Sequence, residues 1–427
     1  MPTLIPGWRC HMLVTLTSKI RILPDEKTAD LLAETMRAYT DACNYVSQHV
    51  FSSRHLQLRR LHDDLYRDIR VRFSLRSQMT ESVIRTVAAR YKALLSSRKP
   101  LKLIRFNKPQ YDLVWNRDYT LKNGVLSVNT LEGRRKIPFL RPGSSLDGKL
   151  GTAKLVYRHG FFFLHVSVTH EVRDVENREI SNVVGIDRGI RFLAAAYDSQ
   201  GKSTFFSGGI IKAKRAHYAA LRKELQQVGT PSARRRLKAI GQRKNRWMRD
   251  VNHCISKALV KRHPAGTLFV LEDLTGIRRA TERMKHKHRY VSVSWSFYDF
   301  EQKLMYKAVM REQKVIRVDP AYTSQTCPCC RHTEGANRDK RRHVFRCIRC
   351  GYTSNDDRIA AMNLYRKGKE YLVQSGESMP LTGGAKSAAP DVTPAIWNKN
   401  HMVTNAGGVS RLLQGSHKPP LLQVAGS

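Results

Sequence analysis

The sequence predicts an α/β protein built from several domains, and three observations support this prediction. The chain has 427 residues, which is enough for two or three domains. Apolar residues follow a helical period over residues 20–100, alternate with polar residues over 101–180, and form strands alternating with helices from residue 181. A group of cysteines within residues 327–350 interrupts this third region and indicates a small metal-binding insertion.

The first half of the chain is expected to contain an antiparallel β module with helices inserted into it. Residues 11–16 have the composition of a short strand, and residues 101–180 contain alternating runs broken by turn signals such as Asn-Gly at 123–124. Between them the apolar spacing predicts two helices, one from about Asp25 and one over residues 76–95. We expect the strands on both sides of these helices to pack together.

The second half is expected to form an α/β sheet, followed by a disordered tail from residue 371 that has no sustained apolar period. The expected elements are, in order, a strand at 182–187, a hairpin over 191–206, helices over 212–262, a strand at 267–274, a helix at 296–313, a strand at 314–319 and a last helix at about 356–367.

The charge of the chain indicates a polyanionic partner. Lys and Arg number 76 against 35 Asp and Glu, which gives a formal net charge of +41. Such an excess would repel itself in a compact state unless a polyanion neutralised it, so nucleic acid is favoured and a small-molecule enzyme is disfavoured. The sequence has no apolar run of about 18 residues, and its first residues lack the pattern of a signal peptide.

The cysteine spacing predicts one structural zinc ion. Cys327, Cys330, Cys347 and Cys350 form the pattern C-x2-C-x16-C-x2-C, in which two tight turns supply four thiolates for tetrahedral coordination. Cys329 could compete with Cys330, but only Cys330 preserves the two-residue spacing. The alternative is a set of free or redox-active thiols.

Three acidic positions are candidates for a second metal site. Asp187 ends one apolar strand, and Glu272 and Asp273 end another. Because side chains alternate along a strand, only one of that pair can face Asp187. Asp356 and Asp357 open the last helix, where simple helix capping is the competing interpretation. Such a set of carboxylates could hold two Mg²⁺ ions for phosphodiester hydrolysis.

Five blocks of sequence together resemble the signature blocks of the TnpB (OrfB) family, in the same order. These are RNA-guided nucleases encoded by insertion-sequence transposons and related to the compact type V CRISPR effectors. The resemblance is close over residues 180–366 and looser over 20–170. The blocks are VVGIDRGIRFLAAAYDSQG, RRRLKAIGQRKNRWMRDVNHCISKALV, LFVLEDLTGI, VIRVDPAYTSQTCPCC and SNDDRIAAMNLY.

The resemblance implies an RNase H-like RuvC nuclease domain with Asp187, Glu272 and Asp357 as its catalytic triad. It also implies an inserted zinc ribbon that binds target nucleic acid, a preceding antiparallel wedge module, and a helical recognition module inserted into the wedge. The implied boundaries are 1–19 and 101–180 for the wedge, 20–100 for the recognition module, 181–326 and 351–370 for RuvC, 327–350 for the ribbon and 371–427 for the disordered tail.

The sequence departs from the family pattern at three positions. Asn355 stands where the family usually has Asp, and Ile359 stands where it has Asn. The position that matches the last catalytic acid is Asp357, with Asp356 as the alternative. Arg331 follows the first cysteine pair where the family usually has Gly, so an irregular first turn is expected.

Basic residues supply candidate nucleic-acid contacts. Residues 212–249 hold 13 Lys and Arg against one acid, and residues 278–289 are a candidate mobile lid. The competing interpretation of such runs is a solvated surface. The resemblance also places a DNA-facing recognition helix near residue 78, whose polar side would read base edges. The candidate contacts are Arg234, Arg235, Arg236, Arg243, Lys244 and Arg246, and on the recognition helix Gln78, Ser82 and Arg85.

The implied function is an RNA-guided DNA endonuclease that binds a transposon-derived guide RNA. It would cut double-stranded target DNA beside a short motif, as a monomer with one RNA in a bacterial or archaeal cytoplasm. The alternatives are a compact CRISPR effector nuclease and a guide-dependent DNA-binding repressor without cleavage, although all three triad acids are present. A strand-transferring transposase is disfavoured by the order of the blocks.

Overall fold

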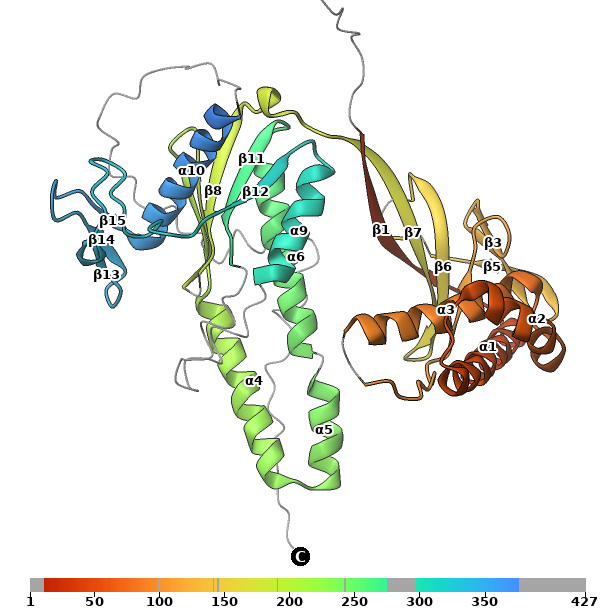
Figure 1. The fold of residues 1–427 in the computed structure, drawn as a ribbon. Coiled ribbons are helices and arrows are strands. Elements are labelled where there is room, and N and C mark those ends of the chain that lie inside the picture. The colour runs from red at the N-terminus through yellow and green to blue at the C-terminus, as the bar shows by residue number, and fades with distance from the viewer. Residues whose placement is uncertain are drawn as a thin grey trace, which may run out of the picture. The chain divides into compact units, whose positions relative to one another are not determined.

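The structure, a computed structural model, describes residues 11–97, 100–140, 142–143, 146–189, 191–241, 243–274 and 297–375 (Figure 1). They divide into two compact units, His11–Val172 and the described residues from Arg173 onward. Within these ranges no helix is both long enough and apolar enough to cross a membrane. The candidate lid at 278–289 and the predicted tail after residue 375 lie outside the described residues.

The N-terminal unit contains a four-stranded and a three-stranded sheet. The strands are β1 (His11–Ile22), β2 (Gln110–Leu113), β3 (Tyr119–Lys122), β4 (Val125–Thr130), β5 (Gly133–Pro138), β6 (Lys149–Arg158) and β7 (Phe161–Arg173). The larger sheet has the order β1-β7-β6-β2, so the strand before the helices lies beside a strand that follows them. In the turn between β3 and β4, Asn123 and Gly124 take φ angles of 48° and 76°, as the Asn-Gly signal predicts.

Three helices, not two, follow β1 in this unit: α1 (Glu26–Ser53), α2 (Leu58–Phe73) and α3 (Ser77–Ser96). The sequence did not predict α2, because half of its residues are Asp or Arg and only three of its side chains, Leu61, Leu65 and Ile69, are buried. β1 extends to Ile22, so it is also longer than the predicted strand at 11–16 and crosses the predicted boundary at residue 19.

The C-terminal unit is built on a five-stranded mixed sheet of order β10-β9-β8-β11-β12. The strands are β8 (Asn182–Asp187), β9 (Phe192–Asp198), β10 (Ser203–Ser207), β11 (Thr267–Glu272) and β12 (Lys314–Val318). β8, β11 and β12 run parallel, whereas β9 and β10 are antiparallel and form the predicted hairpin. The interior residues of β8 and all but the last residue of β11 are buried, which explains their continuous apolar sequences.

Helices cover both faces of this sheet (Figure 1). The helices of this unit are α4 (Gly209–Val228), α5 (Pro231–Gly241), α6 (Arg243–Arg262), α9 (Phe297–Val309) and α10 (Asp356–Gln374). Apolar residues of α6 and α9 pack on one face, and those of α10 pack on the other. α10 lies so close to β8 that a Cβ on Gly185 would be 2.1 Å from the carbonyl oxygen of Ala361, which accounts for a glycine in the middle of this strand.

Two predicted boundaries need correction. α10 continues to Gln374, beyond the predicted end of the domain at residue 370, because Leu372 is buried in the same core as Leu364. The cysteine-rich insertion contains a small sheet of β13 (Arg338–Asp339), β14 (Val344–Arg346) and β15 (Thr353–Asn355), in that order. Its last strand lies after residue 350, so the predicted ribbon was too short.

Candidate functional site

Two of the predicted acids end neighbouring strands. β8 and β11 are parallel, and Leu271 pairs with Ile186 in the register between them. The next residues along the two strands are Glu272 and Asp187, so both carboxylates stand at the same edge of the sheet, and both are partly exposed. Ligands of α/β sheets bind at this carboxyl edge of parallel strands.

The third acid, Asp357, lies in the first turn of α10. The side chain of Asn355 caps this helix by accepting hydrogen bonds of 3.1 Å from the backbone N–H groups of Asp357 and Arg358. Asp357 is 7% exposed, and its Oδ2 is buried without a hydrogen-bond partner. A Cβ built on Gly189, two residues after Asp187, would lie 3.8 Å from Asp357 Oδ1, so the helix start meets the end of β8.

The three acids interact electrostatically. Burial raises the pKa of Asp187 well above its usual value, and the charges of Glu272 and Asp357 raise it further, while Arg338 opposes them. Burial and the neighbouring Asp356 likewise raise the pKa of Asp357. Repelling carboxylates with an unpartnered buried oxygen favour a bound cation. No trio of acids in the described part of the chain brings its oxygens within 4.8 Å of one another, so the acids do not form a closed single-ion cage.

Asp356, the alternative to Asp357, has a different environment. It is fully buried, and its Oδ2 lies 2.9 Å from Arg338 Nη2 and 3.6 Å from His343 Nδ1. Both partners come from the cysteine-rich insertion. Asp356 therefore fastens the insertion to the start of α10.

Two supporting side chains were missed by the sequence analysis. Arg188 is buried beside Glu301 of α9, with Nη1 at 2.9 Å from Glu301 Oε2, and it donates a second hydrogen bond to the backbone oxygen of Glu272. Thr323 donates a hydrogen bond to the Glu272 carboxylate. These partners are 113 and 51 residues apart in sequence, so no local pattern could reveal them.

The predicted cysteine ligands come together. The Sγ atoms of Cys327 and Cys350 are 3.6 Å apart, those of Cys330 and Cys347 are 3.5 Å apart, and all four lie within 4.8 Å of one another. Cys329 is exposed and lies outside this group. The four thiols form a cluster that could bind a metal ion.

The first cysteine turn is regular despite Arg331. Arg331 N–H donates to Cys327 O at 3.0 Å, and Gly351 N–H donates to Cys347 O at 2.9 Å in the second turn. Their φ angles are 64° and 73°, so Arg331 adopts the left-handed conformation that glycine adopts more readily. The expectation of an irregular first turn was wrong.

Most of the basic candidates lie on exposed helix surfaces. Arg234, Arg235 and Arg236 are exposed on α5, and Arg243 and Arg246 are exposed at the start of α6, whereas Lys244 is partly buried. α4 and α5 extend away from the sheet (Figure 1) and pack on each other through a small apolar core that includes Leu225 and Ile240. The arginines are therefore available to a polyanion without loss of packing.

The candidates on α3 fit their predicted role less well. Ser82 is only 8% exposed, so the prediction that it lies on the polar side of this helix was wrong. Its neighbours Val83 and Ile84 are also buried, so the buried face of α3 is wider than the apolar spacing in the sequence predicts. Gln78 accepts a hydrogen bond of 2.9 Å from Arg117, and Arg85 is exposed.

Two family models match this chain. Residues 165–275 match the model described as "Probable transposase" of the OrfB type, and residues 297–364 match the model "Cas12f1-like, TNB domain". The first match contains Asp187 and Glu272, and the second contains the four cysteines and Asp357. These matches confirm the resemblance to the TnpB (OrfB) family and to compact CRISPR nucleases.

Curated relatives agree with this resemblance. The chain is 30% identical over 222 residues to "CRISPR-associated endodeoxyribonuclease Cas12f1" of Sulfoacidibacillus thermotolerans, a match that covers 48% of this chain and 50% of the relative. It is 27% identical over 242 residues to "Putative RNA-guided DNA endonuclease InsQ" of Escherichia coli K12, with 52% and 58% covered. The chain thus spans about half the length of these relatives. The solved "mini-RNA-guided endonuclease CRISPR-Cas_phi3" is 10% identical with a TM-score of 0.47, covering 86% of this chain and 94% of that one.

Proposed function

We propose that this chain is an RNA-guided DNA endonuclease of the RuvC type. The observation that carries the proposal is the meeting of three acids at one edge of the sheet, where Asp187 and Glu272 end parallel strands and Asp357 opens the helix that packs on them. Two curated relatives are named as endonucleases of DNA, which supports the reaction class.

The acids fit two Mg²⁺ ions as cofactors. Magnesium prefers oxygen ligands, and the unpartnered buried Oδ2 of Asp357 offers one at this edge of the sheet. When bound, the ions would activate a water molecule and stabilise the leaving oxygen of a phosphodiester. Asp187, Glu272 and Asp357 would hold them, and Arg188 supports this edge by donating a hydrogen bond to the backbone oxygen of Glu272.

The four-cysteine cluster fits one structural zinc ion. Four thiolates leave no open coordination position, so this site would organise the insertion and would not take part in the reaction.

The remaining parts are assigned by the same proposal. The unit His11–Val172 would correspond to the wedge with its inserted recognition helices, and the exposed arginines of α5 and α6 would contact guide RNA or its duplex with target DNA. Such contacts position the nucleic acid without reading its sequence. The relative named as CRISPR-associated favours a second candidate, a compact CRISPR effector, and the sequence of the copurified RNA distinguishes the two.

The test is Mg²⁺-dependent cleavage of a guide-matched DNA. Asp187→Ala and Glu272→Ala should lose cutting and keep binding of RNA and target, because each removes only a metal ligand. Asp250→Ala, which removes an exposed acid of α6, is the matched control and should cut normally. Robust cutting by Asp187→Ala would falsify the assignment of the centre.

A further inference from the structure

The segment between β12 and the cysteine cluster, residues 319–326, reaches the candidate centre through Thr323. This side chain is 3% exposed, and its Oγ1 lies 2.5 Å from Glu272 Oε1 and 3.0 Å from Pro320 O. A hydroxyl group has one hydrogen to donate, and an ionised carboxylate is the stronger acceptor. Thr323 therefore donates to Glu272, which leaves the second carboxylate oxygen, Oε2, free of this bond.

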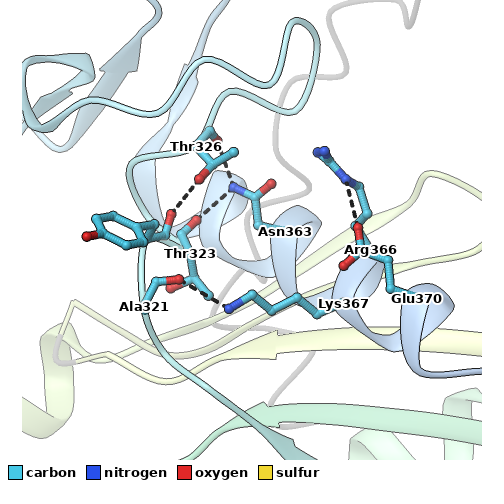
Figure 2. Close-up of a pocket in the computed structure, with 8 residues that line it drawn as sticks. Ala321, Thr323, Thr326, Asn363, Arg366, Lys367 and Glu370 are labelled. Carbon is cyan, nitrogen blue, oxygen red and sulfur yellow. Dashed lines mark hydrogen bonds and ion pairs between the residues drawn. The ribbon is translucent and has the colours of Figure 1, made fainter. Parts of the chain in front are cut away.

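The same segment is fastened to α10 by two side chains one helical turn apart. Asn363 Nδ2 donates to the carbonyl oxygens of Thr323 and Thr326, both at 2.7 Å, and so uses both of its hydrogens (Figure 2). Lys367 Nζ donates to Asp319 O at 2.6 Å and to Ala321 O at 3.1 Å. The segment cannot shift without breaking bonds to α10.

These contacts connect two of the three acids by a route outside the sheet. Asn363 lies on the helix that begins with Asp357, and it fixes the backbone of the residue whose hydroxyl holds Glu272. The segment and α10 together line a pocket of about 180 Å³, with Thr323 and Thr326 on the segment side and Asn363, Arg366, Lys367 and Glu370 on the α10 side (Figure 2). Asn363 and Lys367 hold the segment from α10, and Asn337 and Arg338 hold it from the cysteine-rich insertion through Gln325 O and Ser324 Oγ.

We propose that Thr323 is a positioning residue for Glu272, and that Asn363 holds Thr323 so that Glu272 and Asp357 keep a fixed spacing. Without the hydroxyl group, the Glu272 carboxylate gains rotational freedom, which must be lost again when metal binds. The inference rests on the proposed function, because Glu272 must be a metal ligand for its orientation to matter.

The test compares Thr323→Val, which keeps the shape and removes the donor, with Thr323→Ser, which keeps the donor. Thr323→Val should raise the Mg²⁺ concentration for half-maximal cleavage by about tenfold, the size expected for one hydrogen bond to a charged group. Its rate at saturating Mg²⁺ should stay near that of the unmodified protein. Thr323→Ser should restore the lower half-saturation.

A matched control removes another hydroxyl from the same segment. Thr326 Oγ1 donates to Tyr322 O at 2.9 Å and lies 3.0 Å from Thr333 Oγ1, and neither group is an acid. Thr326→Val should therefore keep the half-saturation of the unmodified protein. Binding of Mn²⁺ to each variant, followed by electron paramagnetic resonance, should show the same tenfold difference without any cleavage.

The outcomes distinguish the positioning role of Thr323 from the proposed metal centre. If Thr323 has a purely structural role, Thr323→Val should lower the active fraction without changing the Mg²⁺ half-saturation or the Mn²⁺ affinity. That result, together with an inactive Glu272→Ala, would overturn the positioning role and leave the proposed centre intact. Cutting by Glu272→Ala would overturn the proposed centre and the positioning role together. If Thr323→Val does not fold, Thr323→Ala provides the same comparison.

Discussion

Replacing Arg188 by Met tests how α9 is held to the residue that follows β8. Arg188 is 1% exposed at its side chain and pairs with Glu301, which is 7% exposed. Removing one partner of a buried pair costs about 3–5 kcal/mol, because the other charge stays buried. Because Arg317 also pairs with Glu301, we expect the free energy of unfolding to fall by an amount near the lower end of this range, about 3 kcal/mol. For a unit of this size this lowers Tm by roughly 6–12 °C.

The matched control is Arg317→Met. The Arg317 side chain is 43% exposed, so its pair with the same Glu301 is screened by water and should contribute about 0–1 kcal/mol. Calorimetric melting of the RNA-free protein measures the stability of both variants. The double variant Arg188→Met with Glu301→Leu should lose less free energy of unfolding than the sum of the losses of Arg188→Met and Glu301→Leu. Equal losses for Arg188→Met and Arg317→Met would refute the reasoning from burial.

Three further changes test other parts of the molecule. Cys347→Ser should abolish the binding of about one zinc ion per chain, and Cys329→Ser should keep it, as measured by elemental analysis. Arg331→Gly should stabilise the cysteine-rich insertion by about 1 kcal/mol, because glycine adopts the left-handed conformation without penalty, and hydrogen exchange there should slow. Reversal of the arginines at 234–236 to Glu should weaken RNA binding and reduce its salt dependence, and an unchanged slope in a salt titration would exclude them from the interface.

Patterns within short segments predicted much of the fold. The apolar runs of β8 and β11, the Asn-Gly turn at 123–124 and the two cysteine pairs each depend on neighbours in sequence, and the structure contains all of them. α2 was missed because its narrow apolar stripe is hidden among charges, and the end of α10 was missed because Leu372 is held by the sheet and not by a local pattern.

The surroundings of the acids could not be predicted in the same way. The match to the family pattern favoured Asp357, with Asp356 as the alternative, but it could not show that Asp356 is paired with Arg338 in the interior. The roles of Arg188 and Thr323 depend on contacts between distant segments. Ser82 was placed wrongly because a polar residue on a helix can be buried when its neighbours pack on both sides.

The most direct test of guided cleavage by these acids starts from the RNA that copurifies with the protein. A duplex DNA matched to the variable end of that RNA is incubated with Mg²⁺ and either the unmodified protein or Asp357→Ala. The unmodified protein should cut the matched duplex and leave an unmatched one intact, and Asp357→Ala should bind the matched duplex without cutting it. Equal cutting by an RNA-free preparation, or cutting by Asp357→Ala at the unmodified rate, would contradict the account.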